Sequence, residues 1–202
     1  MKAEYDLIAS QWQAIRTTLP KPDQALFRCF LNQLPQESTI LDLGCGTGTP
    51  VAQLLIENGH RITGVDRSKK LLAVAQERFP LHQWHLQDLE SFNTNHTYNG
   101  VVIWDSLFHL PREQHLPLLI KAYQALSPEG LLILSSGGSD TNIAPFTGVM
   151  FDVEFFYDAY PVAELITLCE SIGFTVIDKK MVNQPDGKKD KGRLGLVMKK
   201  TG

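Results

Sequence analysis

The sequence predicts a three-layer α/β fold in which a mostly parallel sheet lies between two layers of helices. Seven short apolar runs alternate, for most of the chain, with segments whose apolar residues recur at helical spacing. Parallel strands joined at this spacing need right-handed crossovers that cover both faces of the sheet. The last two runs, residues 174–182 and 192–199, are separated by a short turn, so at least one strand must run antiparallel to the rest.

Length and composition bound the remaining possibilities. A chain of 202 residues with 43% hydrophobic and 20% charged residues fits one globular domain. We expect a helical cap over residues 1–36 and the core over residues 37–202. The three cysteines are widely spaced and suit neither a disulfide framework nor a zinc site. No signal peptide or membrane-length apolar run is visible, so we expect a soluble, cytoplasmic protein.

Helices and strands alternate regularly through the first half of the chain. Ser68 is the expected N-cap of one helix, and Gly59 is the expected end of another. The expected elements are helices 3–16 and 22–34, strand 38–44, helix 49–59, strand 60–66, helix 68–79, and strands 82–88 and 98–105.

The second half begins with an expected turn over residues 110–115 and a helix over 116–126, which places Pro117 near the first helical position. The basic run 186–193 is interpreted as a solvated hairpin turn without a function. The other expected elements are strand 130–136, a glycine-rich and then aromatic segment over 137–160, helix 162–174, and strands 174–182 and 192–199.

The end of the first strand carries the most informative pattern. Gly44, Gly46 and Gly48 follow the strand, and Asp42 lies two residues before them. A glycine-rich turn after a strand usually cradles a phosphate, which a nearby carboxylate would repel. The spacing is G-x-G-x-G, whereas a dinucleotide fingerprint has G-x-G-x-x-G. Both departures predict a ligand whose end near the glycines is cationic.

Five segments in order, LDLGCGTG, GVDRSKKLL, LQDLE, GVVIWDSLFHLP and LSPEGLLILS, resemble the motifs of the class I S-adenosylmethionine-dependent methyltransferases. The resemblance covers nearly the whole chain and implies a Rossmann-like, seven-stranded sheet whose reversed seventh strand lies between strands five and six. The pairing of YDLIASQW with WDSLFHLPREQH is similar to a group of small bacterial-type methyltransferases whose small-molecule substrate is unassigned.

The resemblance implies S-adenosyl-L-methionine as cofactor and S-adenosyl-L-homocysteine as product. Asp42 would attract the ammonium, and Asp66 would accept hydrogen bonds from the ribose hydroxyls. The implied cofactor-binding residues are Tyr5, Trp12, Asp42, Gly44, Cys45 (through its backbone), Gly46, Asp66, Arg67, Leu71, Asp88, Leu89 and Trp104.

Several of these assignments have a structural alternative that the sequence leaves open. Asp66 could be a helix N-terminal charge, Asp88 a turn former, Arg67 a surface cation and Leu71 a core residue. Tyr5 and Trp12 stand seven residues apart, so we expect both on one face of an N-terminal helix. There they either close over the sulfonium or anchor the cap.

For catalysis we expect in-line displacement at the methyl carbon, with transfer to an oxygen, nitrogen or carbon atom of a small molecule. An O–H acceptor also needs a base, for which His109 is the first candidate and Asp105 the second, although His109 could equally be a packing residue. The net charge of −3 argues against a nucleic-acid partner, and the histidines show no metal-binding spacing.

An apolar or aromatic acceptor is suggested by the aromatic residues Phe146, Phe155, Phe156, Tyr157 and Tyr160. Two other functions stay open at this point. One is a non-catalytic S-adenosylmethionine-binding protein, because methyl transfer has no obligatory side-chain signature. The other is a nicotinamide-dependent oxidoreductase, which Asp42 and the glycine spacing disfavour. The oligomeric state is not predicted.

Overall fold

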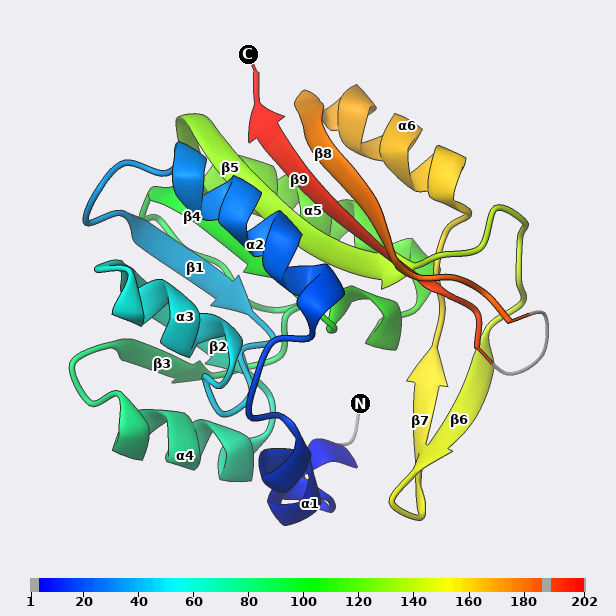
Figure 1. Ribbon diagram of the computed structural model, residues 1–202, viewed down its shortest axis with the longest axis horizontal. Helices are drawn as coiled ribbons and strands as arrows, with labels where there is room; N and C mark the ends of the chain where they lie inside the picture. Colours follow the sequence, from blue (N-terminus) through cyan, green and yellow to red (C-terminus); the bar gives the residue numbers. More distant parts are fainter. Residues whose placement is uncertain (1–3, 187–189, 202) are drawn as a thin grey trace.

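A computed structural model describes residues 4–186 and 190–201 of this chain (Figure 1). Seven strands form one sheet in the order β3-β2-β1-β4-β5-β9-β8. Strand β9 runs antiparallel to both β5 and β8, and the other paired strands run parallel. This confirms the predicted sheet and its reversed strand. The bounds are β1 (Thr39–Leu43), β2 (Arg61–Asp66), β3 (Gln83–Leu86), β4 (Tyr98–Ile103), β5 (Leu126–Gly137), β8 (Phe174–Asn183) and β9 (Arg193–Lys200).

Strand β1 lies at the centre of the parallel half of the sheet. From Ile40 to Leu43 its residues are buried, which is typical of a parallel strand covered by helices on both faces. In the register, Asp42 lies opposite Gly64 of β2 and Val102 of β4. The carboxyl ends of these three strands therefore meet at one edge of the sheet.

Helices cover both faces, and each layer has its own core. Helices α2 and α3 pack on one face around Phe27, Phe30 and Leu55, and α5 and α6 pack on the other around Leu119 and Leu165. No helix in the described ranges is long and apolar enough to cross a membrane. The bounds are α2 (Lys21–Gln33), α3 (Val51–Glu57), α4 (Lys69–Arg78), α5 (Arg112–Ala125) and α6 (Val162–Ile172).

Local sequence signals explain two helix ends. Ser68 caps α4 by accepting a hydrogen bond from the backbone N–H of Leu71, as predicted. Helix α6 ends at Gly173, whose φ of +114° is the left-handed conformation that favours glycine. Helix α2 belongs to the predicted cap, but its apolar residues pack against the main sheet and form part of the hydrophobic core. The boundary between a cap of residues 1–36 and a core of residues 37–202 stays a prediction.

The N-terminal segment differs from the single helix that the sequence predicted. It consists of a short 3-10 turn, η1 (Glu4–Asp6), and helix α1 (Ala9–Ile15). Ile8, which is fully buried, lies between them and anchors the break. Tyr5 and Trp12 thus do not share one helix face, although their rings are in edge-to-face contact with centroids 5.1 Å apart.

Helix α5 also begins earlier than predicted. Residues 112–115 form its first turn, and Pro117 lies inside the helix. Pro111 takes the N-cap position with an extended backbone, and His115 is fully buried with its Nε2 bonded to the carbonyl of Leu110. Pro117 has no backbone N–H and so removes one hydrogen bond from the helix interior.

The segment 137–160 contains a β-hairpin that the sequence analysis did not predict. Strands β6 (Phe146–Met150) and β7 (Val153–Tyr157) pair antiparallel and form a sheet of their own. Phe151 and Asp152 make the two-residue turn, both with positive φ. In Figure 1 the hairpin projects away from the main sheet, beyond the carboxyl end of β5.

Candidate functional site

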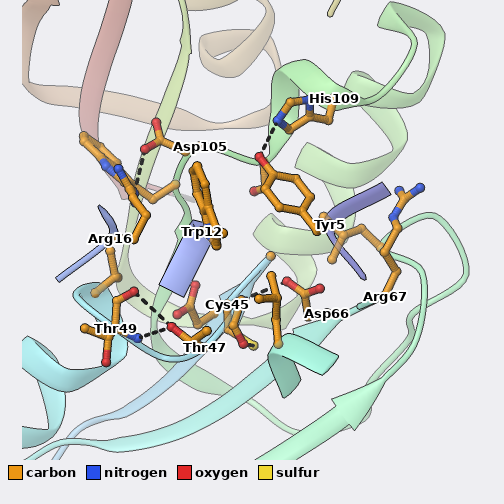
Figure 2. A pocket seen from close by; sticks show the side chains of 18 of the residues that line it. Tyr5, Trp12, Arg16, Cys45, Thr47, Thr49, Asp66, Arg67, Asp105 and His109 are labelled. Carbon is orange, nitrogen blue, oxygen red and sulfur yellow. Dashed lines mark hydrogen bonds and ion pairs between the residues drawn. The ribbon is translucent and has the colours of Figure 1, made fainter. Parts of the chain in front are cut away.

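A pocket lies at the carboxyl ends of β1, β2 and β4, under the N-terminal segment (Figure 2). All predicted site residues except Asp88 line it, although they come from widely separated parts of the chain. They are Tyr5, Trp12, Asp42, Gly44, Cys45, Gly46, Asp66, Arg67, Leu71, Leu89, Trp104, Asp105 and His109.

The glycine loop after β1 is shaped by a close approach to the loop after β4. Gly44 has a φ of +91°, and a Cβ atom there would lie 2.4 Å from the Cβ of Ser106. The Ser106 hydroxyl donates to the carbonyl of Leu43 at 2.7 Å, so it fastens the two loops together. Glycine is therefore required at position 44 both for its backbone conformation and for space.

Asp42 has a buried carboxylate oxygen without a hydrogen-bond partner beside this loop. Its side chain is 2% exposed, and its Oδ2 has no hydrogen-bond partner among the described residues. Burial, followed by the nearby charge of Asp66, raises the pKa of Asp42 to about 7. A buried carboxylate without a cation is costly, so this position fits a ligand with a cationic end.

Asp66, at the end of β2, holds the glycine loop and keeps free acceptor capacity. Its Oδ2 accepts from the backbone N–H of Gly46, and its Oδ1 accepts from that of Ser68, both at 2.8 Å. Burial raises the pKa of Asp66, although these two bonds oppose the shift. Because a carboxylate has about four acceptor positions, two remain for a ligand that donates hydrogen bonds.

Beyond Asp66 the pocket is bounded by Arg67 and by the buried side chains of Leu71 and Leu89. The Arg67 guanidinium lies 3.6 Å from Asp88 and 3.4 Å from Glu90. Asp88 does not line the pocket, and its side chain is 49% exposed. Its predicted contact with a ligand stays a prediction.

Tyr5 and His109 form a hydrogen-bonded pair in the same pocket, as Figure 2 shows. His109 Nδ1 lies 2.9 Å from the carbonyl oxygen of Phe156, which can only accept, so Nδ1 carries the proton. In the neutral ring Nε2 is then the acceptor, and it receives the Tyr5 hydroxyl at 3.0 Å. Burial lowers the pKa of His109 and raises that of Tyr5, so both are neutral at pH 7.

Asp105 lies in the same pocket within a chain of alternating charges. One oxygen accepts from Arg16 at 2.8 Å and the other from Arg193 at 2.6 Å. Arg193 also pairs with Asp23 at 2.7 Å, and the Trp104 indole donates to Asp23 at 3.1 Å. Both Asp105 oxygens are thus engaged by guanidinium groups.

This chain of charges corrects one prediction. Arg193 is not a solvated turn residue, because its side chain is 18% exposed and bonded to two carboxylates. Residues 187–189 of the same predicted turn lie outside the described residues. Sequence reasoning also did not single out Arg16 and Ser106 as pocket residues, since nothing near them in the sequence shows their distant partners.

The Cys45 side chain is buried in the glycine loop, and burial raises the pKa of its thiol. A neutral, buried thiol is a poor nucleophile, which agrees with a contribution through the backbone alone. Cys29, Cys45 and Cys169 are free thiols. Across residues 4–186 and 190–201, no group of three or more His, Cys, Asp or Glu side chains is arranged to hold a metal ion.

Comparisons with known proteins agree with this geometry. Residues 40–130 match a family model described as a methyltransferase domain. YqeM of Bacillus subtilis (strain 168), which carries a methyltransferase name, is 29% identical over 154 residues, covering 71% of this chain. The chain spans 62% of the length of that relative.

Two solved structures share the fold at low sequence identity. A Burkholderia thailandensis 1,6-didemethyltoxoflavin-N1-methyltransferase, bound to its named substrate and S-adenosylhomocysteine, has a TM-score of 0.69 at 22% identity over 90% of this chain and 78% of its own. An S-adenosylmethionine-dependent methyltransferase from Clostridium acetobutylicum ATCC 824 has a TM-score of 0.73 at 17% identity over 98% and 99%. At these identities the likeness establishes the fold.

Proposed function

We propose that this chain, a class I S-adenosylmethionine-dependent methyltransferase by its matched domain and its fold, binds S-adenosyl-L-methionine and methylates a small molecule. The observation that carries the proposal is the buried, unpartnered oxygen of Asp42 beside a glycine loop. An ammonium group satisfies this oxygen, whereas a pyrophosphate would be repelled by it. The same acid therefore disfavours a nicotinamide dinucleotide.

We assign the remaining pocket residues to the ribose, the adenine and the sulfonium of the cofactor. Asp66 offers its two free acceptor positions to the ribose hydroxyls. Leu71 and Leu89 supply an apolar slot for the adenine, with Arg67 at its edge and Asp88 beside Arg67. Tyr5 and Trp12 present aromatic rings, whose negative faces favour a sulfonium. When bound, the cofactor supplies an activated methyl group, so positioning is the main task of the protein.

His109 is the residue that we propose as general base. Its protonated Nδ1 donates to the Phe156 carbonyl, so the basic lone pair is on Nε2. In this structure the Tyr5 hydroxyl donates to Nε2. An acceptor O–H that replaces Tyr5, or that bonds to its oxygen, can pass its proton to Nε2. Asp105 is the weaker candidate, because two arginines engage its oxygens. We assign Asp105 a positioning role toward Arg16.

Calorimetry tests the cofactor assignment. We expect S-adenosylhomocysteine to bind and NADH not to bind. Asp66→Ala removes two charged hydrogen bonds to the ribose, so its affinity for S-adenosylhomocysteine falls roughly 100-fold, about 3 kcal/mol. Leu116→Ala, a partly exposed position on α5 outside the pocket, is the control that retains affinity. Tight NADH binding without S-adenosylhomocysteine binding would refute the proposal.

Turnover needs a second measurement, because a non-catalytic protein could bind the same cofactor. We expect transfer of labelled methyl from S-adenosylmethionine to components of a metabolite extract. His109→Asn should lower the transfer rate and flatten its pH profile while S-adenosylhomocysteine affinity is unchanged. Cofactor binding without transfer to any component across pH and extract type would leave a binding protein as the better description.

A further inference from the structure

A second cavity, of about 430 Å³, lies beside the first pocket along the same edge of the sheet. It is found at the carboxyl end of β5, next to the start of β9 and the end of β8, and the β6–β7 hairpin closes one side. The first pocket occupies the ends of β2, β1 and β4. The sheet order β2-β1-β4-β5-β9-β8 therefore places the two cavities next to each other.

The wall between the cavities is one layer of side chains thick. His109 lines the first pocket, and its neighbour Phe108 lines the second. The ring of Tyr157, in the second cavity, lies 4.9 Å from the His109 ring between centroids. Asp105 of the first pocket and Arg193 of the second are joined by a 2.6 Å ion pair. A molecule in the second cavity is thus separated from the proposed base by a single ring.

The loop over this cavity is fixed by a buried ion pair. Asp158, 5% exposed, accepts from the Arg112 backbone N–H at 2.8 Å and from its guanidinium at 2.7 and 2.9 Å. The same guanidinium donates to Asn142 and to the carbonyl of Ile143. Hydrogen bonds therefore hold the wall of the cavity in place.

Among the residues that line the cavity, Ser136 is fully buried. Its Oγ is buried and makes no hydrogen bond to any residue in the described ranges. Its neighbour Ser135 faces the other side of β5, where its hydroxyl contacts Asp105. An unsatisfied buried hydroxyl destabilises the protein, and a ligand that bonds to it removes that cost.

The remaining lining indicates an uncharged, ring-shaped ligand. Phe108, Tyr157 and Phe146 form a stack, with centroids 5.9 and 5.3 Å apart. Arg193 is paired with Asp23 and Asp105, and Asp158 is paired with Arg112. Asp190 and Lys191, which have opposite charges, also line the cavity, so its described lining carries no net charge. Stacked aromatic walls in a lining without net charge suit a neutral ring carrying a hydrogen-bonding group.

We propose that the second cavity binds the body of the methyl acceptor, a neutral aromatic or alicyclic compound with a hydroxyl or carbonyl group that bonds to Ser136. The reactive atom enters the first pocket past His109. This inference rests on the proposed function. It makes Ser136 and the loop at residues 143–146 the specificity determinants of the enzyme.

The probe for the test is 2-naphthol, which is neutral at pH 7 and whose own fluorescence reports binding. Ala144, an exposed residue that lines the cavity, is changed to Trp to fill it. Val149→Trp on the adjoining strand β6, 74% exposed and outside the cavity lining, is the matched control. Ser136→Ala removes the orphan hydroxyl, which should not lower the melting temperature because no hydrogen bond of the described protein is lost.

We expect Ala144→Trp to weaken 2-naphthol binding at least ~10-fold and Ser136→Ala to weaken it ~5-fold, as loss of one hydrogen bond predicts. Val149→Trp should have no effect, and all three variants should retain S-adenosylhomocysteine affinity. Naphthalene-2-sulfonate should bind more weakly than 2-naphthol. Absence of 2-naphthol binding, equal binding by Ala144→Trp, or displacement by S-adenosylhomocysteine would overturn the inference. Failure of the wild type to bind S-adenosylhomocysteine would instead refute the proposed function.

Discussion

Two groups of buried and half-buried carboxylates differ in whether the protein itself supplies their partners. Asp23 and Asp105 belong to a chain in which every charge has a partner of opposite sign: Arg193 joins the two carboxylates, and Arg16 pairs with Asp105 at the end of the chain. Asp42 and Asp66 belong to the pocket, where backbone N–H groups bond to Asp66 and one oxygen of Asp42 has no partner among the described residues. The carboxylates of the first group are all paired with arginine side chains of the protein. Those of the second group have no cationic partner in the described residues, and Asp42 has one oxygen without any hydrogen bond.

This difference distinguishes charges that hold a structure from charges that hold a ligand. Removing one member of a paired buried group strands the other, so the fold is destabilised. Removing an unpaired buried charge relieves a desolvation penalty, so the free protein loses little stability while the ligand loses its partner. The comparison therefore predicts opposite responses to substitutions of the same type.

The largest expected effect is that of Asp23→Ala on stability. Asp23 is fully buried, and its loss leaves the Arg193 guanidinium with Asp105 as its remaining carboxylate. We expect the free energy of unfolding, measured in urea, to fall by about 3 to 5 kcal/mol. Leu26→Ala on the same helix gives the reference for a purely apolar loss. A decrease below about 1 kcal/mol for Asp23→Ala would remove the distinction between the two groups.

Asp42→Asn should act on binding instead. We expect affinity for S-adenosylhomocysteine to fall ~10- to 100-fold, because the ammonium loses a charged hydrogen bond. Calorimetry measures this loss. Asp23→Asn, with the same chemical change in the paired group, is the control and should keep the affinity of whatever fraction stays folded.

The pH dependence of stability gives Asp42 a second signature. Its pKa is about 7 in the folded protein against an ordinary 3.8, so between these values the folded state binds more protons than the unfolded state. The contribution of Asp42 to stability is therefore present at low pH and lost as the pH rises through 7. Urea unfolding at pH 5 and pH 8 should show this loss in the wild type, and Asp42→Asn should lack it. Parallel pH profiles for the two proteins would contradict the assignment.

The smallest expected effect is that of Arg16→Gln, at the partly exposed end of the paired chain. Asp105 keeps Arg193 as a partner, and the Arg16 pair is partly screened by solvent. We expect a loss of roughly 1 kcal/mol or less in urea unfolding. Arg28→Gln, an exposed arginine on α2, should change stability by less than Arg16→Gln. A loss comparable to that of Asp23→Ala would place the centre of the network at Arg16.

Sequence reasoning performed best where local patterns decide structure. Strands β1 to β4, the Ser68 cap and the reversed β9 follow from apolar periodicity, capping and a short turn. The pocket residues were found because glycines and acids at strand ends are local signals. Arg193 was misjudged because its partners, Asp23 and Asp105, lie 170 and 88 residues away in the sequence. The break at Ile8 likewise depends on tertiary burial.

The β6–β7 hairpin is the part of this protein whose sequence can change with the least effect on the main sheet. Neither of its strands pairs with the seven-stranded sheet, so exchanging its sequence leaves that hydrogen-bonded ladder intact. A combinatorial library confined to β6 and the loop before it leaves this ladder unchanged, and it also spares Phe155 and Phe156 of β7, which line the first pocket. If the proposed function holds, β6 and the loop before it are the segment in which substrate preference can change with the least disturbance of the first pocket.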